Sequence, residues 1–255
     1  MSKFIEDAVV VSNKFIAEKF FLLRVKAPQI ARAALPGQFC EIKTSETAAP
    51  LLRRPFSISN VENDEIEFMI DVVGVGTEIL SREKTGDVVN ILGPLGKGFN
   101  YTGNFDTAFL LAGGAGVAPF PFLYQKLVEE KKDILAVAGF SSEGKIPENV
   151  TDKFLIATDD GSVGFHGTAV ELAEKILNER KSSKIKAFAC GPVPMLKAAK
   201  NFFAEKKIEL EISVESAMAC GIGLCQGCAI ERADGQGYFL ICKDGPVFNS
   251  KEVIL

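Results

Sequence analysis

The chain has 255 residues, of which 47% are hydrophobic, and it carries a formal net charge of −4 at pH 7. This size and hydrophobic fraction allow one large folded domain or two or three smaller ones, and they exclude a largely disordered chain. The mild acidity and the lack of a basic stripe argue against nucleic acid as a partner.

The sequence gives no sign of a signal peptide or a membrane helix. Acidic residues interrupt "MSKFIEDAVV" at the N-terminus, where a signal peptide needs a continuous apolar run. The longest uncharged run, residues 107–125, falls just short of the roughly 20 residues of a membrane helix, and Gly and Pro interrupt it. We therefore expect a cytoplasmic protein that does not bind membranes and whose cysteines stay reduced.

Residues 1–100 have the pattern of an antiparallel β-domain. Short alternating or β-branched runs, among them "DAVVVS", "EIEFMIDVV" and "GDVVNILG", are separated by Gly, Pro, Asn and Asp. This pattern predicts antiparallel strands that form a small barrel. The polar, glycine-rich stretch 93–106 predicts a connection to a second domain.

Two stretches in this first half are suited to binding phosphate or a flat ring. In "RRPFSIS" (53–59), Arg can bind phosphate, Phe can pack on a ring, and Ser can hydrogen-bond to ring heteroatoms. In "VVGVGTEIL" (72–80), a Gly-x-Gly-Thr turn opens a short helix whose N-terminus favours an anion. The alternative for "RRPFSIS" is an exposed edge strand with a charged start.

Residues 101–214 alternate between apolar strands and segments of helical periodicity. Strands are predicted at "TAFLLAG", "DILAVAG", "KFLIAT", "IKAFAC" and "IELEISV". One helix is predicted from the common face of Phe120, Leu123, Tyr124, Leu127 and Val128. A second begins at a capping box of Thr168 and Glu171, and a third covers 193–206. This alternation predicts a doubly wound parallel sheet.

A glycine-rich turn follows the first of these strands. In "LLAGGAGVAPF" (110–120), Gly113, Gly114 and Gly116 let the backbone approach a ligand closely, and the following helix offers free N–H groups to a pyrophosphate. Pro119 stands where the G-x-G-x-x-G fingerprint has its last glycine. The alternative is a tight strand–helix turn that binds nothing.

These motifs, in this order, resemble those of the ferredoxin–NADP reductase superfamily. The resemblance rests on the "RPFS" run, the Gly-Thr pair, "GGAGVAP" and "CGPVPM" (190–195), and it spans roughly residues 5–214. It implies an FAD-binding β-barrel followed by a nicotinamide-nucleotide domain. Some relatives have Tyr where Phe56 stands, so a hydroxyl contact is missing here.

The resemblance also implies roles for single residues. Arg54 would hold the FAD pyrophosphate, Pro55 belongs to the same motif, and Phe56 and Ser57 would lie against the isoalloxazine. Met69, Ile70 and Asp71 would run along the ribityl and phosphate part of the flavin, and Gly76 and Thr77 would help at the phosphates. Gly114 and Gly116 would face the dinucleotide pyrophosphate. The Cys190–Gly191–Pro192 turn would border the nicotinamide.

The choice of nicotinamide cofactor depends on "AGFSSEGK" (138–145), where the adenosine ribose is expected. No Arg follows directly to bind a 2′-phosphate, and Glu143 would repel one, which favours NAD over NADP. The loop 158–167 would cover the nicotinamide site, with Asp159 and Asp160 as carboxylates or turn formers. His166 is the only histidine, and we expect it on the surface. No catalytic residue is predicted, because hydride transfer needs no protein base.

Four cysteines gather near the end of the chain. Cys220, Cys225 and Cys228 have the C-x4-C-x2-C spacing of plant-type [2Fe–2S] proteins, and Cys242 follows thirteen residues later. The intervening glycines free the backbone to curl around the cluster and to aim N–H groups at sulfur. A structural zinc site usually has two C-x2-C pairs, and only one occurs here. Cys40 and Cys190 stand apart from this group.

The tail "ESAMACGIGLCQGC…CKDGPVF" (215–248) resembles the electron-transfer subunit of type B, NAD-dependent dihydroorotate dehydrogenase. The family therefore implies a multidomain α+β chain: an FAD-binding barrel (1–100), an α/β NAD-binding domain (101–214) and a small [2Fe–2S] domain (215–255). It also implies a function. Electrons from dihydroorotate oxidation to orotate on a catalytic FMN subunit would pass through [2Fe–2S] and FAD to NAD⁺. Two copies of each subunit would form a heterotetramer. The chain has no room for the (β/α)8 barrel of that partner.

Two alternatives remain open from the sequence. The first is a subunit of a related NAD(P)H-dependent ferredoxin or sulfide oxidoreductase, since these share the layout. The second is a zinc-stabilised binding protein that senses NAD without using it. Met218, Ile222 and Leu224 near the cysteines could contact a partner or shield a cluster from water.

Overall fold

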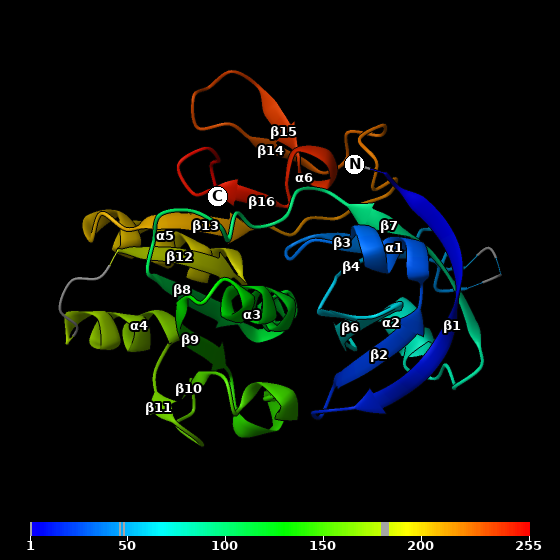
Figure 1. The fold of residues 1–255 in the computed structure, drawn as a ribbon, viewed down its shortest axis with the longest axis horizontal. Coiled ribbons are helices and arrows are strands. Elements are labelled where there is room, and N and C mark those ends of the chain that lie inside the picture. The colour runs from blue at the N-terminus through cyan, green and yellow to red at the C-terminus, as the bar shows by residue number, and fades with distance from the viewer. Residues whose placement is uncertain (1, 46, 48, 180–183) are drawn as a thin grey trace.

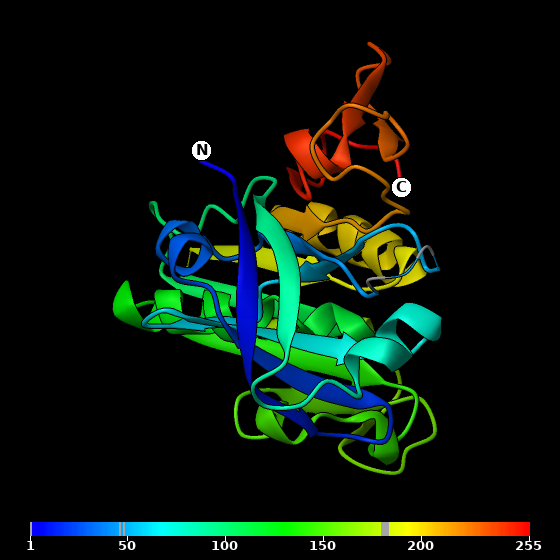
Figure 2. The same cartoon turned by 90° about the vertical axis from the view of Figure 1, so that its right-hand side faces the viewer.

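The computed structural model describes residues 2–45, 47, 49–179 and 184–255. Two seven-stranded sheets form the two halves of the molecule, and a short C-terminal segment lies across one end of both (Figures 1 and 2). Across the described residues, no helix is both long and apolar enough to cross a membrane.

The N-terminal half is a curled antiparallel sheet (Figure 1) with the strand order β4-β3-β7-β1-β2-β6-β5. In β2, the side chains of Phe21, Leu23 and Val25 are fully buried, because alternate residues of a strand face the same side. The predicted antiparallel barrel is thus confirmed as a curled sheet around one apolar core. Its elements are β1 (Phe4–Phe15), β2 (Phe20–Lys26), α1 (Pro28–Ala33), β3 (Phe39–Ile42), β4 (Arg54–Ser57), β5 (Asn60–Glu62), β6 (Glu65–Asp71), α2 (Val75–Leu80) and β7 (Val88–Leu95).

The second half is an α/β layer with the strand order β11-β10-β9-β8-β12-β13-β16. The five predicted strands and three predicted helices are all present, and the Thr168–Glu171 capping box forms as expected. Its elements are β8 (Thr107–Gly113), η1 (Gly114–Val117), α3 (Phe120–Glu129), β9 (Asp133–Phe140), η2 (Glu143–Lys145), η3 (Glu148–Val150), β10 (Leu155–Thr158), β11 (Phe165–His166), α4 (Ala169–Asn178), β12 (Ile185–Cys190), α5 (Val193–Glu205), β13 (Glu209–Ser213) and β16 (Val247–Asn249).

Helices cover both faces of this sheet. Leu110 of β8 packs in one core cluster with α3, whereas its neighbours Phe109 and Leu111 pack in another with α4 and α5. One residue of α3 differs from the predicted helical face: Val128 is 55% exposed. Phe122 is buried instead and belongs to the core of the N-terminal half, because α3 lies between the two halves.

The C-terminal segment contains more regular structure than the loops predicted for it. It forms β14 (Ala229–Glu231), β15 (Tyr238–Leu240) and α6 (Ile241–Asp244) before β16. β16 pairs antiparallel with β13, with Ser213 opposite Val247, so the tail ends as an edge strand of the otherwise parallel sheet. Strands of three residues are too short to show periodicity in the sequence, which explains why they were missed.

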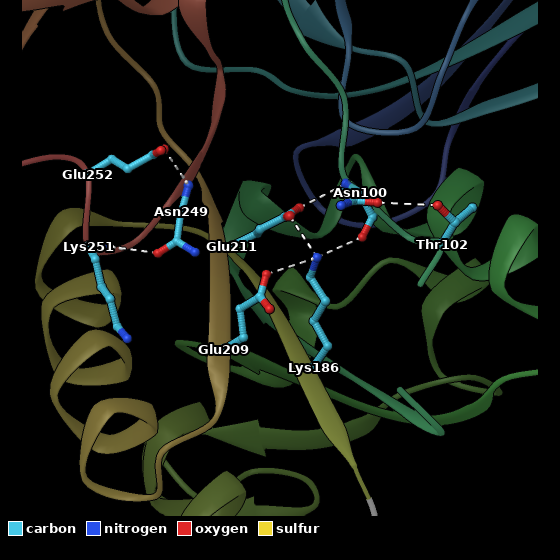
Figure 3. Close-up of polar contacts among 8 residues, drawn as sticks. All are labelled: Asn100, Thr102, Lys186, Glu209, Glu211, Asn249, Lys251 and Glu252. Atoms are coloured by element: carbon cyan, nitrogen blue, oxygen red, sulfur yellow. Dashed lines mark hydrogen bonds and ion pairs between the residues drawn. The ribbon is translucent and has the colours of Figure 1, made fainter. Parts of the chain in front are cut away.

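A buried ionic network fixes the connection between the two halves (Figure 3). Lys186 Nζ lies 2.8 Å from Glu211 Oε1 and 3.1 Å from Glu209 Oε1, and it donates to the main-chain oxygen of Asn100 at 2.9 Å. Glu211 Oε2 accepts from the backbone N–H of Asn100 at 2.9 Å. The network therefore attaches residue 100 of the connecting segment to β12 and β13.

We expect Lys186→Ala to lower the free energy of unfolding by about 3–5 kcal/mol, because Glu211 would then stay buried without its cation. Urea denaturation followed by circular dichroism measures this. Lys184→Ala is the control, since the Lys184 side chain is exposed and its amine donates to Asn104 Oδ1 at the long distance of 3.3 Å. Equal stability of the two variants would contradict the role of the network.

Candidate functional site

A cavity of about 290 Å³ opens between the curled sheet, the loop after β8 and the end of β13. Seven residues that the resemblance assigns to flavin binding line it: Pro55, Phe56, Ser57, Met69, Ile70, Asp71 and Thr77. They come from β4, β6 and the first turn of α2, so the fold brings together motifs that are separate in the sequence. The wall is largely apolar, with a few hydroxyl and carboxylate groups, as is usual for sites that hold a flat organic cofactor.

Arg54 and Gly76 lie together beside this cavity. A Cβ atom added to Gly76 would lie 3.5 Å from Arg54 Nε and 3.3 Å from Thr44 Oγ1. The Thr44 hydroxyl is buried and, among the described residues, has no hydrogen-bond partner. A guanidinium, an orphaned hydroxyl and the N-terminus of α2 thus meet at one place, which fits a phosphate group.

The Thr77 hydroxyl is engaged by its own helix. It accepts from the backbone N–H groups of Val73 at 3.0 Å and Gly74 at 3.1 Å, and it donates to the Gly74 carbonyl. Thr77 therefore shapes the start of α2. Its proposed contribution at the phosphates comes through the position of that turn.

The glycine turn after β8 packs on the turn that follows β12. A Cβ atom on Gly116 would lie 2.3 Å from the Cys190 carbonyl oxygen and 2.5 Å from Gly191 N. Gly114 has φ +52° and faces open space. Burial raises the pKa of the Cys190 thiol, which therefore stays neutral. Gly114, Gly116 and the 190–192 turn do not line the 290 Å³ cavity; Ala115 and Ala118 of the same loop do.

Residues at the end of β13 and directly after it also line the cavity and were not predicted as site residues. They are Ser213, Val214, Glu215 and Ser216. A signal for them existed in the sequence: ligands of parallel α/β sheets bind beyond the carboxyl ends of the strands, and "IELEISV" was a predicted strand.

The four cysteines of the tail come together as two pairs. The Cys225 N–H donates to Cys220 Sγ at 3.4 Å, and the Cys242 N–H donates to Cys228 Sγ at 3.4 Å. Across the described residues, no three His, Cys, Asp or Glu side chains converge closely enough to hold one metal ion. Two pairs of thiols are the donor set that a two-iron centre needs, with two thiolates for each iron.

Backbone N–H groups of the loop point at the first thiol. The N–H of Cys225, with those of Ile222 and Leu224, lowers the pKa of Cys220 to about 6. Burial, together with the neighbouring Cys228, raises the pKa of Cys242 to about 12. The exposed end of the loop is thus prepared for a thiolate, whereas the buried thiol needs a cation before it loses its proton.

The apolar residues beside the cysteines fall into two classes. Met218 and Ile222 are half-buried and pack against the core cluster that includes Cys228 and Cys242. Leu224 is 76% exposed, at the tip of the loop. The core thus holds Met218 and Ile222 in place, whereas Leu224 is exposed.

Comparison with known proteins agrees with this geometry. Residues 215–254 match the model of the iron–sulfur cluster binding domain of dihydroorotate dehydrogenase B. The electron transfer subunit of dihydroorotate dehydrogenase B (NAD⁺) from Desulforamulus reducens is 39% identical, with coverage of 100% of this chain and 99% of the relative. The chain belongs to this family of electron-transfer subunits. The homologous subunit from Fusobacterium nucleatum is 34% identical over 98% of both chains.

Solved structures give the same fold. An NADH-dependent reduced ferredoxin–NADP oxidoreductase, described for flavin-based electron bifurcation, aligns with a TM-score of 0.86 and 26% identity, over 98% of this chain and 90% of that one. A ferredoxin–NADP⁺ reductase from Neisseria gonorrhoeae with bound FAD and NADP aligns with a TM-score of 0.67 and 17% identity, over 79% and 91%. The second likeness shows the fold alone. Family and fold together make the chain an oxidoreductase component with an iron–sulfur binding domain and a flavin- and nucleotide-binding architecture.

Proposed function

We propose that this chain transfers electrons from a partner flavoprotein, which oxidises dihydroorotate to orotate, to NAD⁺, and that it holds FAD and a [2Fe–2S] cluster for this purpose. One observation carries the proposal. The segment that lines the flavin-type cavity, residues 213–218, leads directly into the cysteine loop, and Met218 of the cavity wall is two residues from Cys220. The cavity and the cysteine loop are therefore adjacent, which supports neighbouring sites for the two proposed cofactors.

Each group of residues has a distinct task in this proposal. Arg54 and the start of α2 would bind the FAD pyrophosphate, while Phe56, Ser57 and the end of β6 would orient the ring system. Gly114, Gly116 and the Cys190–Pro192 turn would place the nicotinamide nucleotide at the carboxyl edge of the sheet. Cys220, Cys225, Cys228 and Cys242 would bind the irons, and Met218 and Ile222 would exclude water. When bound, FAD would accept or give two electrons as a hydride with the nicotinamide and one electron at a time with the cluster.

The partner follows from the family. The relatives are electron transfer subunits of dihydroorotate dehydrogenase B, so a catalytic subunit must deliver the electrons. We propose the FMN-containing dihydroorotate dehydrogenase in a two-plus-two heterotetramer, with the exposed Leu224 at the contact. In the proposed division of the chain, FAD binds residues 1–100, NAD binds residues 101–214 and the [2Fe–2S] cluster binds residues 215–255.

Coexpression of the tagged chain with the catalytic subunit from the same genome tests the function. We expect a stable complex that contains FMN, FAD, iron and acid-labile sulfide and that reduces NAD⁺ when dihydroorotate is added. A complex that contains FMN, FAD, iron and sulfide but reduces NAD⁺ only with reduced ferredoxin would instead support a second candidate function, that of a subunit of a ferredoxin-linked oxidoreductase. The TM-score of 0.86 to the ferredoxin-linked structure favours that candidate.

Arg54→Ala is expected to lower FAD retention about tenfold or more, because a phosphate loses a charge-assisted contact of about 1.5–3 kcal/mol. The flavin-to-protein ratio after gel filtration measures this. Arg82→Ala is the matched control, since Arg82 is exposed and pairs with its helix neighbour Glu78. Equal flavin content in the two variants would remove Arg54 from the pyrophosphate site.

A further inference from the structure

Glu41 of β3 occupies an unusual position for a carboxyl group. All four residues of β3 are buried. Cys40 and Ile42 point into the core of the curled sheet, whereas Phe39, on the opposite face, belongs to the core cluster that includes Cys228 and Cys242 of the tail. Alternation along the strand places Glu41 on the same face as Phe39, toward the cysteine loop.

The Glu41 side chain touches that loop directly. A Cβ atom on Gly221 would lie 2.7 Å from Glu41 Cγ and 3.0 Å from Glu41 Oε1. Gly221 follows the ligand Cys220 and has φ +65°, a conformation that glycine adopts at low cost. The loop therefore comes so close to the carboxyl group that only a residue without a side chain fits between them.

In the part of the chain that the structure describes, no cation forms a hydrogen bond or ion pair with this carboxyl group. Glu41 is 0% exposed, and neither of its carboxylate oxygens has a hydrogen-bond partner among the described residues. The Arg53 guanidinium donates to the main-chain oxygens of Glu41 and Asn90 and to the Asn90 side chain. Arg54 Nη1 donates to the main-chain oxygens of Leu52 and Arg53. Both arginines are near but are bound elsewhere.

An unpaired, buried carboxyl group is expensive and is found where it has a task. Burial raises the pKa of Glu41 to about 7, while Arg53 opposes the shift and a Cys220 thiolate adds to it. An apolar residue such as the neighbouring Ile42 would fill a fully buried position without this cost. The retained acid is next to the loop where one electron would be added or removed.

We propose that the Glu41 carboxylate sets the reduction potential of the iron–sulfur cluster by placing a buried negative charge against its ligand loop. The inference rests on the proposed assignment of the cluster to Cys220, Cys225, Cys228 and Cys242. Reduction adds a negative charge to the cluster, and a carboxylate in a water-poor interface opposes it more strongly than one in solvent. Glu41 thereby keeps the potential low, toward that of the nicotinamide couple that the chain serves.

The test is an anaerobic redox titration of the full chain at pH 8.5, followed by electron paramagnetic resonance of the reduced cluster. Glu41→Gln is expected to keep its iron and acid-labile sulfide and to shift the midpoint potential to a more positive value. Glu41→Leu removes the same charge with an apolar side chain and is expected to shift it in the same direction. Glu41→Asp keeps the charge and should stay closer to the wild-type value than either.

Glu231→Gln is the control. It removes an exposed carboxylate from the C-terminal segment that holds the four cysteines. Water and salt screen this charge, so the reduction potential should not change. Gln and Leu variants that hold a full cluster at the wild-type potential would overturn the role of Glu41 and leave the proposed function intact. A wild-type chain without iron and acid-labile sulfide would overturn both.

Discussion

Cys225→Ser is expected to leave the chain without its proposed iron–sulfur cluster. Cys225 lies at the exposed end of the loop, and its N–H donates to Cys220 Sγ at 3.4 Å. Serine keeps that backbone N–H. Its hydroxyl, however, replaces a thiolate with a group that is not ionised at neutral pH and binds iron poorly. One iron would then have a single protein thiolate, so the bound iron should fall almost to zero.

Iron and acid-labile sulfide analysis of anaerobically purified protein, together with the visible spectrum, measures this loss. Cys40→Ala is the matched control, because Cys40 is a buried thiol in the core of the curled sheet, apart from the four ligands. It should retain the full iron content. A Cys225→Ser protein with wild-type iron and sulfide would show that the ligand set is assigned incorrectly.

The sequence was most informative where an element is long. β8, β9 and β12 are largely apolar runs of six to eight residues and α5 has thirteen residues, so each was predicted close to its observed bounds. β11, with two residues, and β16, with three, have no period to read. They exist because a neighbouring strand offers free hydrogen-bonding groups at the sheet edge, which is a property of the folded sheet.

The candidate site divides in the same way. "RPFS" and the glycine turns could be predicted because their residue types carry the chemistry wherever they are placed. Ser213 to Ser216 line the cavity only because β13 ends beside β4 and β6, although the strand-end rule would have suggested them. Glu41 could not be predicted at all. In the sequence it is one charged residue in an apolar strand, and its contact with Gly221 joins residues 180 positions apart.

The packing of α3 shows a further limit. Periodicity assigned Val128 to the buried face and was silent on Phe122. A helix that contacts only its own sheet would have fulfilled that prediction. α3 also contacts the curled sheet, and this second surface buries Phe122 in the core of the other half. Contacts between halves are decided by shape complementarity, which a hydrophobic pattern does not encode.

Gly116→Ala is expected to weaken the binding of the nicotinamide nucleotide by about tenfold or more. The new Cβ would lie 2.3 Å from the Cys190 oxygen and 2.4 Å from the Cys190 carbonyl carbon. These are backbone atoms of a buried strand end, so the two turns must separate. Overpacking of this kind costs typically 1–3 kcal/mol, and about 1.4 kcal/mol corresponds to a tenfold change in affinity. The pyrophosphate and the nicotinamide are proposed to bind on these two turns.

Calorimetric titration of the flavin-loaded, oxidised chain with NAD⁺, which cannot reduce FAD, measures this loss. Gly74→Ala is the matched control for glycine replacement, because its added Cβ has no atom within 4 Å and its backbone is extended. Gly114→Ala separates strain from collision: its Cβ also meets open space, but its φ of +52° carries a cost of about 1–2 kcal/mol for a residue other than glycine. The predicted order of NAD⁺ affinity is wild type and Gly74→Ala together, then Gly114→Ala, then Gly116→Ala. If Gly116→Ala binds NAD⁺ as tightly as the wild type, the contact between the two turns has no part in holding the nucleotide.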